Sequence, residues 1–233
     1  MHAEDGRICF PEAAPAIQHC IAGRFAQFWR DNGGLDVFGY PIAEAQPEVN
    51  DETGQTYLTQ YFERQRFEHH PEYTAPYDVQ LSRLGDAYLL HTGRNWRHMP
   101  QADPGAHHYM PATGHAIASE FYAHYRSFGL SLGDAGVSDR ESRALFGYPI
   151  SEPMMERVGN RQLLVQYFER TRLEYHPDNP AAHRVLQGRL GSELKPGHDE
   201  YHHSNPSHPE NPDPHHSNPN PGHSNDDNHH THH

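Results

Sequence analysis

Two stretches of the chain carry apolar side chains at the spacing of an amphipathic helix. The members of the first stripe are Ile17, Ile21, Phe25, Phe28 and Trp29, and those of the second are Ile117, Phe121, Tyr125 and Phe128. Intervals of three and four residues place such side chains on one face of a helix. Gly33 follows the first stripe and Gly129 the second, and glycine readily takes the left-handed conformation that ends helices. The pattern therefore predicts one amphipathic helix in each half of the chain.

Short segments with strand-like composition follow each predicted helix. They span 56–63, 66–69 and 79–81 in the first half and 162–169, 172–175 and 185–186 in the second. Their length and their content of Tyr, Phe, Val and Leu are typical of strands. We expect the first two segments of each set to form a β-hairpin and the third to add a strand. Ser138 and Glu141 have the spacing of a capping box, which predicts an extra short helix in the second half.

Four short sequences occur twice. FGYPI at 38–42 recurs at 146–150, QYFER at 60–64 recurs at 166–170, His70-Pro71 recurs as His176-Pro177, and RLG at 83–85 recurs at 189–191. The last three pairs share one offset of 106 residues, so the spacing within each half is preserved. Such a repeat indicates two copies of one structural unit. The Gly and Pro of FGYPI predict a fixed turn that presses Tyr40 and Tyr148 into the packing.

The repeat and a change of composition after Lys195 divide the chain. We expect an α+β fold of two tandem repeat units, each an amphipathic helix followed by a hairpin or a three-stranded sheet. The units span 1–92 and 107–195, with a linker at 93–106 and a tail at 196–233. A unit of about 80 residues is marginally stable alone, so we expect the two units to pack together.

The tail has an unusual composition. It holds 11 of the 23 histidines of the chain, six of its acidic residues, and no Leu, Ile, Val, Phe, Met, Lys or Arg. Such a segment has no apolar surface to bury and so cannot offset the entropy lost on ordering. The sequence therefore predicts a disordered tail.

The tail histidines are candidate metal ligands, since imidazole is the commonest ligand for zinc, nickel and copper and is largely neutral at pH 7. At three or four ligands per ion, 11 histidines could hold about three ions. The alternative is a purification tag or an inert tail. Interspersed Ser, Asn and Pro differ from an unbroken tag and favour native metal binding. The candidate ligands are His198, His202, His203, His208, His215, His216, His223, His229, His230, His232 and His233.

The remaining composition argues against two classes of partner. The formal net charge is −13, with a single Lys against 17 Arg, whereas nucleic acids and anionic lipids select for clustered basic residues. The chain also has no apolar run of roughly 18–20 residues, the length needed to span a bilayer. We therefore expect neither a nucleic-acid partner nor a membrane span.

The recurring motifs resemble a known repeat. Together with GRFAQFW at 23–29, the sequences FGYPI, QYFER, HP and RLG are similar to a tandem repeat of extracytoplasmic proteins from Chloroflexota-type bacteria, over residues 8–92 and 107–192. They are more distantly similar to the LGFP repeats of cell-wall-associated proteins. The resemblance implies a secreted or surface-attached accessory module without established chemistry of its own. The first residues contain no signal peptide, which fits a mature chain with an added Met and fits a cytosolic protein equally well.

Cys9 and Cys20 are the two cysteines of the chain, one on the predicted first helix and one just before it. For a secreted protein, the resemblance favours a disulfide that pins the start of this helix. The alternative is a metal site in which both thiols join the adjacent His19.

Other residues suggest chemistry less strongly. Glu63, Arg64, Arg66 and Glu68, with their counterparts Glu169, Arg170, Arg172 and Glu174, could offer carboxylates for hydrolysis, but alternating Glu and Arg more often form cross-strand ion pairs. The matched histidines His19 and His115, and His70 and His176, suggest packing or hydrogen bonds. His69-His70 and His107-His108 could form a folded metal site, and Tyr73, Tyr77, Trp96 and Tyr109 a platform for carbohydrate.

These observations converge on a secreted, non-enzymatic protein. We expect the tail to capture or buffer a divalent transition metal, zinc first, with nickel or copper as other candidates. The alternative function is a cell-wall or polysaccharide-binding module in which the tail is secondary.

Overall fold

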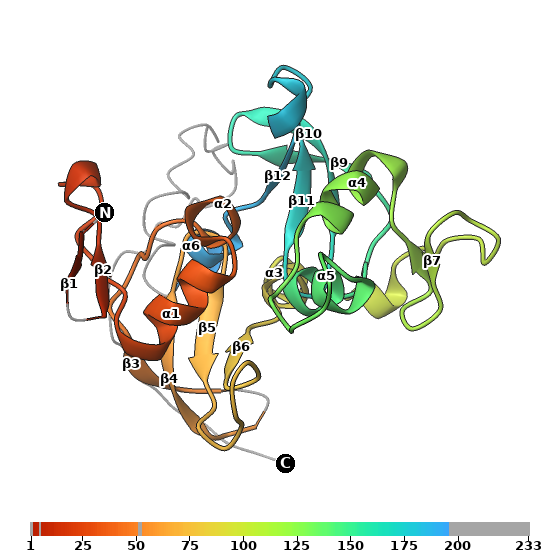
Figure 1. Ribbon diagram of the computed structural model, residues 1–233. Coiled ribbons are helices and arrows are strands. Elements are labelled where there is room, and N and C mark those ends of the chain that lie inside the picture. Colours follow the sequence, from red (N-terminus) through yellow and green to blue (C-terminus); the bar gives the residue numbers. More distant parts are fainter. Residues whose placement is uncertain (1, 5, 51–52, 196–233) are drawn as a thin grey trace, which may run out of the picture.

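Two four-stranded antiparallel sheets form the framework of the described residues, which are 2–4, 6–50 and 53–195 of this computed structural model (Figure 1). The first sheet contains β3 (Gln46–Val49), β4 (Thr56–Tyr61), β5 (Arg66–His69) and β6 (Val79–Leu81), and the second contains β9 (Met154–Val158), β10 (Arg161–Tyr167), β11 (Arg172–Tyr175) and β12 (Val185–Gln187). In both sheets the strands lie side by side in chain order. The α+β class and all the predicted strands are confirmed. An unpredicted edge strand, β3 or β9, makes each sheet four-stranded rather than three-stranded.

The predicted amphipathic helices are present but begin later than expected. The helices are α1 (Gly23–Asp31), α2 (Gly34–Phe38), α3 (Leu84–His91), α4 (Ser119–Ser127), α5 (Asp139–Phe146) and α6 (Leu190–Leu194). Ile17 and Ile21 precede α1, and Ile117 precedes α4, so the predicted starts were wrong. Ile21 is buried because its amide and carbonyl pair with those of Ile8, at 2.8 and 2.7 Å. Its apolar character serves a β-bridge rather than a helix.

The helix predicted from the capping box is α5. Ser138 Oγ accepts a hydrogen bond from the Glu141 amide at 3.1 Å, and the Glu141 carboxylate accepts one from the Ser138 amide at 3.2 Å. The expectation that this helix is extra was wrong, because α2 lies at the same place before FGYPI in the first half. Both helices end at a glycine with positive φ, 77° at Gly39 and 80° at Gly147.

The FGYPI turn buries its phenylalanine rather than its tyrosine. Phe38 and Phe146 have 0% exposure, whereas Tyr40 and Tyr148 are half-buried. Tyr40 packs against the main core, as expected for this residue. The turn is held by the backbone of QYFER. The amide of Arg64 donates to the carbonyl of Phe38 at 3.1 Å, and the equivalent bond from Arg170 to Phe146 measures 3.0 Å.

The main apolar core is continuous between the two halves. It joins aromatic side chains from α1 and the first sheet to those from α4, α5 and the second sheet. A second cluster places Leu89 of α3 against Ile150, Leu163, Val165 and Tyr167. Helix α3 therefore follows the first sheet in the chain but packs on the second.

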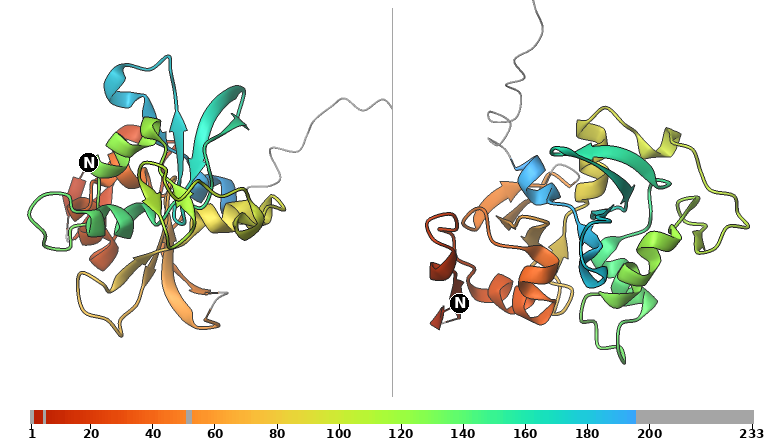
Figure 2. Two further views of the ribbon diagram at one scale, coloured as in Figure 1. Left: turned by 90° about the vertical axis from the view of Figure 1, so that its right-hand side faces the viewer. Right: turned by 90° about the horizontal axis from the view of Figure 1, so that it is seen from above.

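Each RLG motif docks on the QYFER motif of the other half. The Gly85 amide, at the start of α3, donates to the Glu169 carbonyl at 3.1 Å, and the Ser192 amide of α6 donates to the Glu63 carbonyl at 3.1 Å. Ion pairs also join each RLG motif to the QYFER motif of the other half. Arg83 lies 3.3 Å from Glu169, and Arg189 lies 2.5 Å from Glu63. As a result, α3 and α6 lie side by side between the two sheets (Figure 2).

His124, a half-buried histidine, links stability to pH. His124 of α4 lies 4.8 Å from the ring of Phe128 and 6.0 Å from that of Phe146, and burial lowers the pKa of this histidine from 6.5 to about 4. The unfolded chain therefore binds a proton near pH 6.5 that the folded chain binds only near pH 4. We expect this group to cost up to about 3 kcal/mol of stability as pH falls through that window.

Urea unfolding of His124→Phe across the same window measures this effect. The variant should lose less stability on acidification than the wild type, and the difference should close above pH 6.5, the ordinary pKa of the imidazole. His91→Phe is the control, because His91 is exposed at the end of α3. Equal acid sensitivity in the wild type and His124→Phe would contradict the prediction.

Candidate functional site

The eleven predicted metal ligands all fall in 196–233, outside the described residues. The structure does describe the point from which this segment starts. Lys195, the last described residue, donates a hydrogen bond from Nζ to the carbonyl oxygen of Ile42 at 2.9 Å. The last described residue is therefore held beside Ile42, which is two residues before Glu44 in the chain.

The predicted disulfide between Cys9 and Cys20 is confirmed, with the two Cα atoms 4.5 Å apart. The alternative metal site with two free thiols is therefore wrong. The bond does not pin the start of a helix. It joins the end of β2 (Arg7–Cys9) to an extended segment that precedes α1. Closing a loop over a sequence separation of 11 residues stabilises the fold by about 3 kcal/mol in the chain-entropy account.

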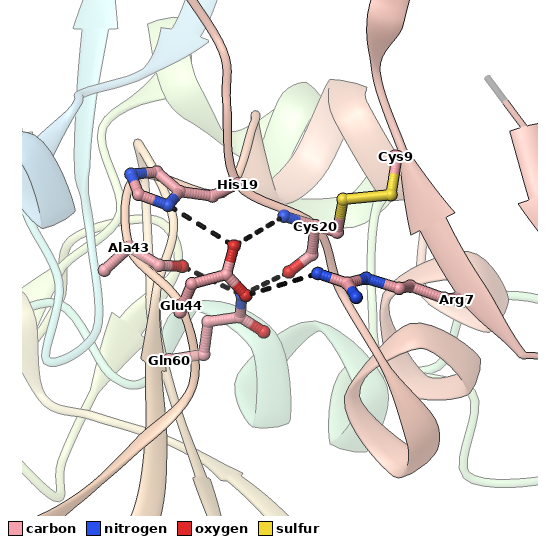
Figure 3. The surroundings of a disulfide bond; sticks show 7 residues. All are labelled: Arg7, Cys9, His19, Cys20, Ala43, Glu44 and Gln60. Atoms are coloured by element: carbon pink, nitrogen blue, oxygen red, sulfur yellow. Dashed lines mark hydrogen bonds and ion pairs between the residues drawn. A yellow bond between two sulfur atoms is a disulfide. The ribbon is translucent and has the colours of Figure 1, made fainter.

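A hollow of about 560 Å³ lies beside this disulfide, with Phe10, Ile17, Arg7 and His19 among its lining residues. Figure 3 shows three groups that converge on the Glu44 carboxylate near it. The Cys20 amide donates at 3.2 Å, His19 Nδ1 lies at 3.5 Å, and the Arg7 guanidinium lies at 3.8 Å. Because this carboxylate already has a cationic neighbour and a backbone donor, the arrangement is that of a structural ion-pair cluster at the surface.

The second half repeats this arrangement in a buried form. His115 Nδ1 lies 3.1 Å from the Glu152 carboxylate, which also accepts from the Ala116 amide at 3.3 Å. The side chain of His115 has 0% exposure, against 39% for His19. The expectation that these matched histidines make hydrogen bonds agrees with the contacts. Their expected place on the helices was wrong, because both residues precede the helix of their half.

The glutamine of each QYFER motif connects these segments to the sheet. Gln60 Nε2 donates to the carbonyls of Cys20 and Ala43, each at 2.9 Å. Gln166 Nε2 donates to the carbonyls of Ala116 and Ser151 at 2.7 and 2.8 Å. These bonds explain why a polar residue recurs at a buried position in both halves.

The recurring Glu and Arg residues form ion pairs, but these pairs lie within one strand or join the two halves rather than crossing the hairpin. Arg66 contacts Glu68 at 2.6 Å, and Arg172 contacts Glu174 at 2.6 Å. Glu63 and Glu169 bind the arginines that precede α6 and α3. Each of the four carboxylates therefore has an arginine partner.

The matched histidines before proline also contact carboxylates. His70 lies between Glu72, 2.9 Å from Nδ1, and Glu68, 3.5 Å from Nε2. His176 Nε2 lies 3.1 Å from Glu174. A structural role for both histidines is consistent with these contacts.

The other expected metal site is not found in the described residues. In 2–4, 6–50 and 53–195, no group of three or more His, Cys, Asp or Glu side chains is placed to hold a metal ion. His70 stacks on Tyr57, with ring centres 3.9 Å apart, and His108 stacks on Tyr122, with ring centres 3.3 Å apart. The two histidine pairs therefore have separate aromatic neighbours.

A second hollow, of about 520 Å³, lies where β4 begins and β5 ends. It is lined by Gln55, Thr56, Tyr57, Leu58, His69, Pro71 and Glu72. Two of the four aromatic residues expected in a carbohydrate platform follow in the next loop, where Tyr73 is 52% and Tyr77 51% exposed. The other two, Trp96 and Tyr109, are half-buried.

The residues around this second hollow were not predicted as a site. Their signal in the sequence is a difference between the halves, since Gln55, Tyr57 and Glu72 correspond to Arg161, Leu163 and Asp178 at the common offset of 106 residues. Positions that are identical in the two halves indicate shared structure. Aligned positions that differ are therefore where the two halves can differ in ligand binding.

Every helix in the described part of the chain is too short or too polar to traverse a bilayer. No protein-family model, curated protein or solved structure matches the chain.

Proposed function

We propose that the protein is a secreted, non-enzymatic metal-binding protein whose C-terminal tail captures or buffers zinc, with nickel or copper as further ions. One observation carries this proposal: 11 histidines are concentrated in 38 residues that contain no core-forming aliphatic side chain. Imidazole nitrogens are good ligands for all three ions. Such a segment offers many ligands and imposes no single geometry, so binding is expected to be labile and loosely selective.

The folded body serves in this proposal as a scaffold of two tandem repeat units. The same strand order in both sheets and the reciprocal contacts of RLG with QYFER support the repeat. The body itself has no cluster of three metal ligands among its described residues. In the proposal, the tail therefore supplies the ligands and the body supplies a fixed point of attachment.

Metal titration of three proteins tests the tail. These are the full chain, a full-length variant with the 11 tail histidines changed to Asn, and a truncation ending at Lys195. By calorimetry with zinc, the full chain should bind about three ions, and the other two proteins should lose this binding. Bound zinc should be released as pH falls below about 6, because the ligating histidines then become protonated. Equal zinc binding by all three proteins would overturn the proposal.

A second candidate function is attachment to cell wall or polysaccharide, with the tail secondary. The observation that favours it is the exposure of Tyr73 and Tyr77 in the loop next to the second hollow, since aromatic rings stack on the apolar faces of sugars. The full-length Asn variant should then be retained on purified cell wall in the presence of a chelator. Its complete recovery in the unbound fraction would exclude this candidate.

A further inference from the structure

We propose that the hollow lined by residues 55–58, His69, Pro71 and Glu72 is a carbohydrate subsite that takes one or two sugar rings of a neutral polysaccharide. This inference rests on the second candidate function and assigns it a place. The volume of the hollow, about 520 Å³, falls within the range of small-ligand sites.

A network of side chains fixes the wall of this hollow. The ring of His70 covers one face of Tyr57, and His70 is itself held between Glu68 and Glu72. The nearby Tyr57 hydroxyl also helps to lower the pKa of the Glu72 carboxyl. Tyr57 and Glu72 are therefore oriented before a ligand arrives, which reduces the entropy lost on binding.

The lining combines the two kinds of surface that a sugar ring presents. Tyr57, Leu58 and Pro71 offer apolar surface to the C–H face of the ring, and Leu58 is exposed. Gln55 and Glu72 offer an amide and a carboxylate to the hydroxyl groups at its edge. Hydrogen bonds from its own backbone amide and from His70 lower the pKa of the Glu72 carboxyl. It is therefore ionised at neutral pH and acts as a charged acceptor, which strengthens hydrogen bonds from hydroxyls.

The same place in the second half is chemically different. Arg161 and Asp178 stand at the positions of Gln55 and Glu72, and their side chains form an ion pair with each other. Leu163 replaces Tyr57 and is only 2% exposed, because α3 packs on it through Leu89. The first half thus has an amide, a phenol and a carboxylate where the second half has a surface ion pair and a buried leucine.

The difference between the halves suggests a variant that removes the site by using only side chains already present at the aligned positions of the second half. Gln55→Arg, Tyr57→Leu and Glu72→Asp together transplant the residues of the second half into the first. The matched control is Arg161→Gln with Asp178→Glu, which makes the reverse exchange at the ion pair of the second half. Thermal unfolding of both variants establishes that they fold.

Isothermal titration of the full chain, with metal removed by a chelator, uses cellohexaose, chitohexaose and laminarihexaose as probes. We expect at least one of them to bind, the triple variant to bind it at least about tenfold more weakly, and the control to bind it as the wild type does. Equal binding by the triple variant would overturn this site but leave the second candidate function standing. Absence of binding by all three probes, with retention on cell wall, would also overturn the site. Choline is titrated as a fourth probe. Binding of choline but of no hexasaccharide would also overturn the carbohydrate site, since the hollow would then favour an organic cation.

Discussion

Alanine at Gly85 or at Gly191 is expected to destabilise the protein by about 3 kcal/mol or more, because neither position has room for a Cβ atom. At Gly85 the added carbon would lie 1.8 Å from the carbonyl oxygen of Phe168, and at Gly191 it would lie 1.9 Å from that of Phe62. The obstructing atoms belong to the backbone, so no side-chain rotation relieves the clash. Accommodating the methyl group requires the helix to move away from the opposite half.

The measurement is the free energy of unfolding of Gly85→Ala and Gly191→Ala from urea titrations. Gly105→Ala is the control, because the nearest atom to its added carbon is the flexible Asp103 carboxylate at 3.2 Å. The control should stay within about 1 kcal/mol of the wild type. A wild-type midpoint for either RLG variant would show that α3 and α6 do not dock on the opposite halves as described.

The recurrence of RLG could be seen in the sequence, but its partner could not. No helix was predicted at either RLG motif, so both α3 and α6 were missed, and the contact of Gly85 with Glu169 joins residues far apart in the chain. Hydrophobic periodicity reports which face of an element is buried and does not identify the element that buries it. For this reason the packing of the two halves was predicted and the exchange of their helices was not.

The false helix starts have a different origin. Ile17 and Ile21 continue the apolar spacing of α1, but Ile21 is buried by pairing with Ile8, beside the disulfide. A segment held by tertiary contacts needs no helical period, so agreement with that period was fortuitous. The edge strand β3 was missed for the opposite reason. It contains Pro47 and is largely exposed, so its sequence shows little alternation of apolar and polar residues.

The candidate sites also differ in how far the sequence could predict them. A disulfide between nearby cysteines follows from composition and the secreted resemblance, and the structure confirms it. The hollow beside Tyr57 depends on which side chains are left uncovered after the two halves pack. Aligning the halves gives the residues that differ, but only the fold distinguishes an open position, at Tyr57, from a covered one, at Leu163.

Substitution of Arg172 by leucine is expected to cost about 3–5 kcal/mol, because it leaves a buried carboxylate without its cation. Arg172 is 1% exposed and lies 2.6 Å from Glu174 and 2.8 Å from Glu193. Burial alone would lower the pKa of this guanidinium, but Glu193 and Glu174 outweigh it and raise the pKa above its ordinary value. The guanidinium also stacks on Tyr88 of α3, at 5.2 Å from the ring centre. The side chain therefore joins the second sheet to both central helices.

Urea unfolding separates two causes of the lost stability, namely the unpaired charge of Glu174 and the lost packing against Tyr88. Arg172→Leu with Glu174→Leu removes both charges of the buried pair, so it should recover much of the stability lost in Arg172→Leu alone, since an uncompensated buried charge costs more than a missing pair. Arg140→Leu is the control, because Arg140 pairs with Asp134 at 2.7 Å on the surface, where such pairs contribute at most about 1 kcal/mol. A double variant less stable than the single one would place the cost in lost packing against Tyr88 rather than in the unpaired charge of Glu174. An effect of Arg172→Leu no larger than that of Arg140→Leu would contradict the buried network itself.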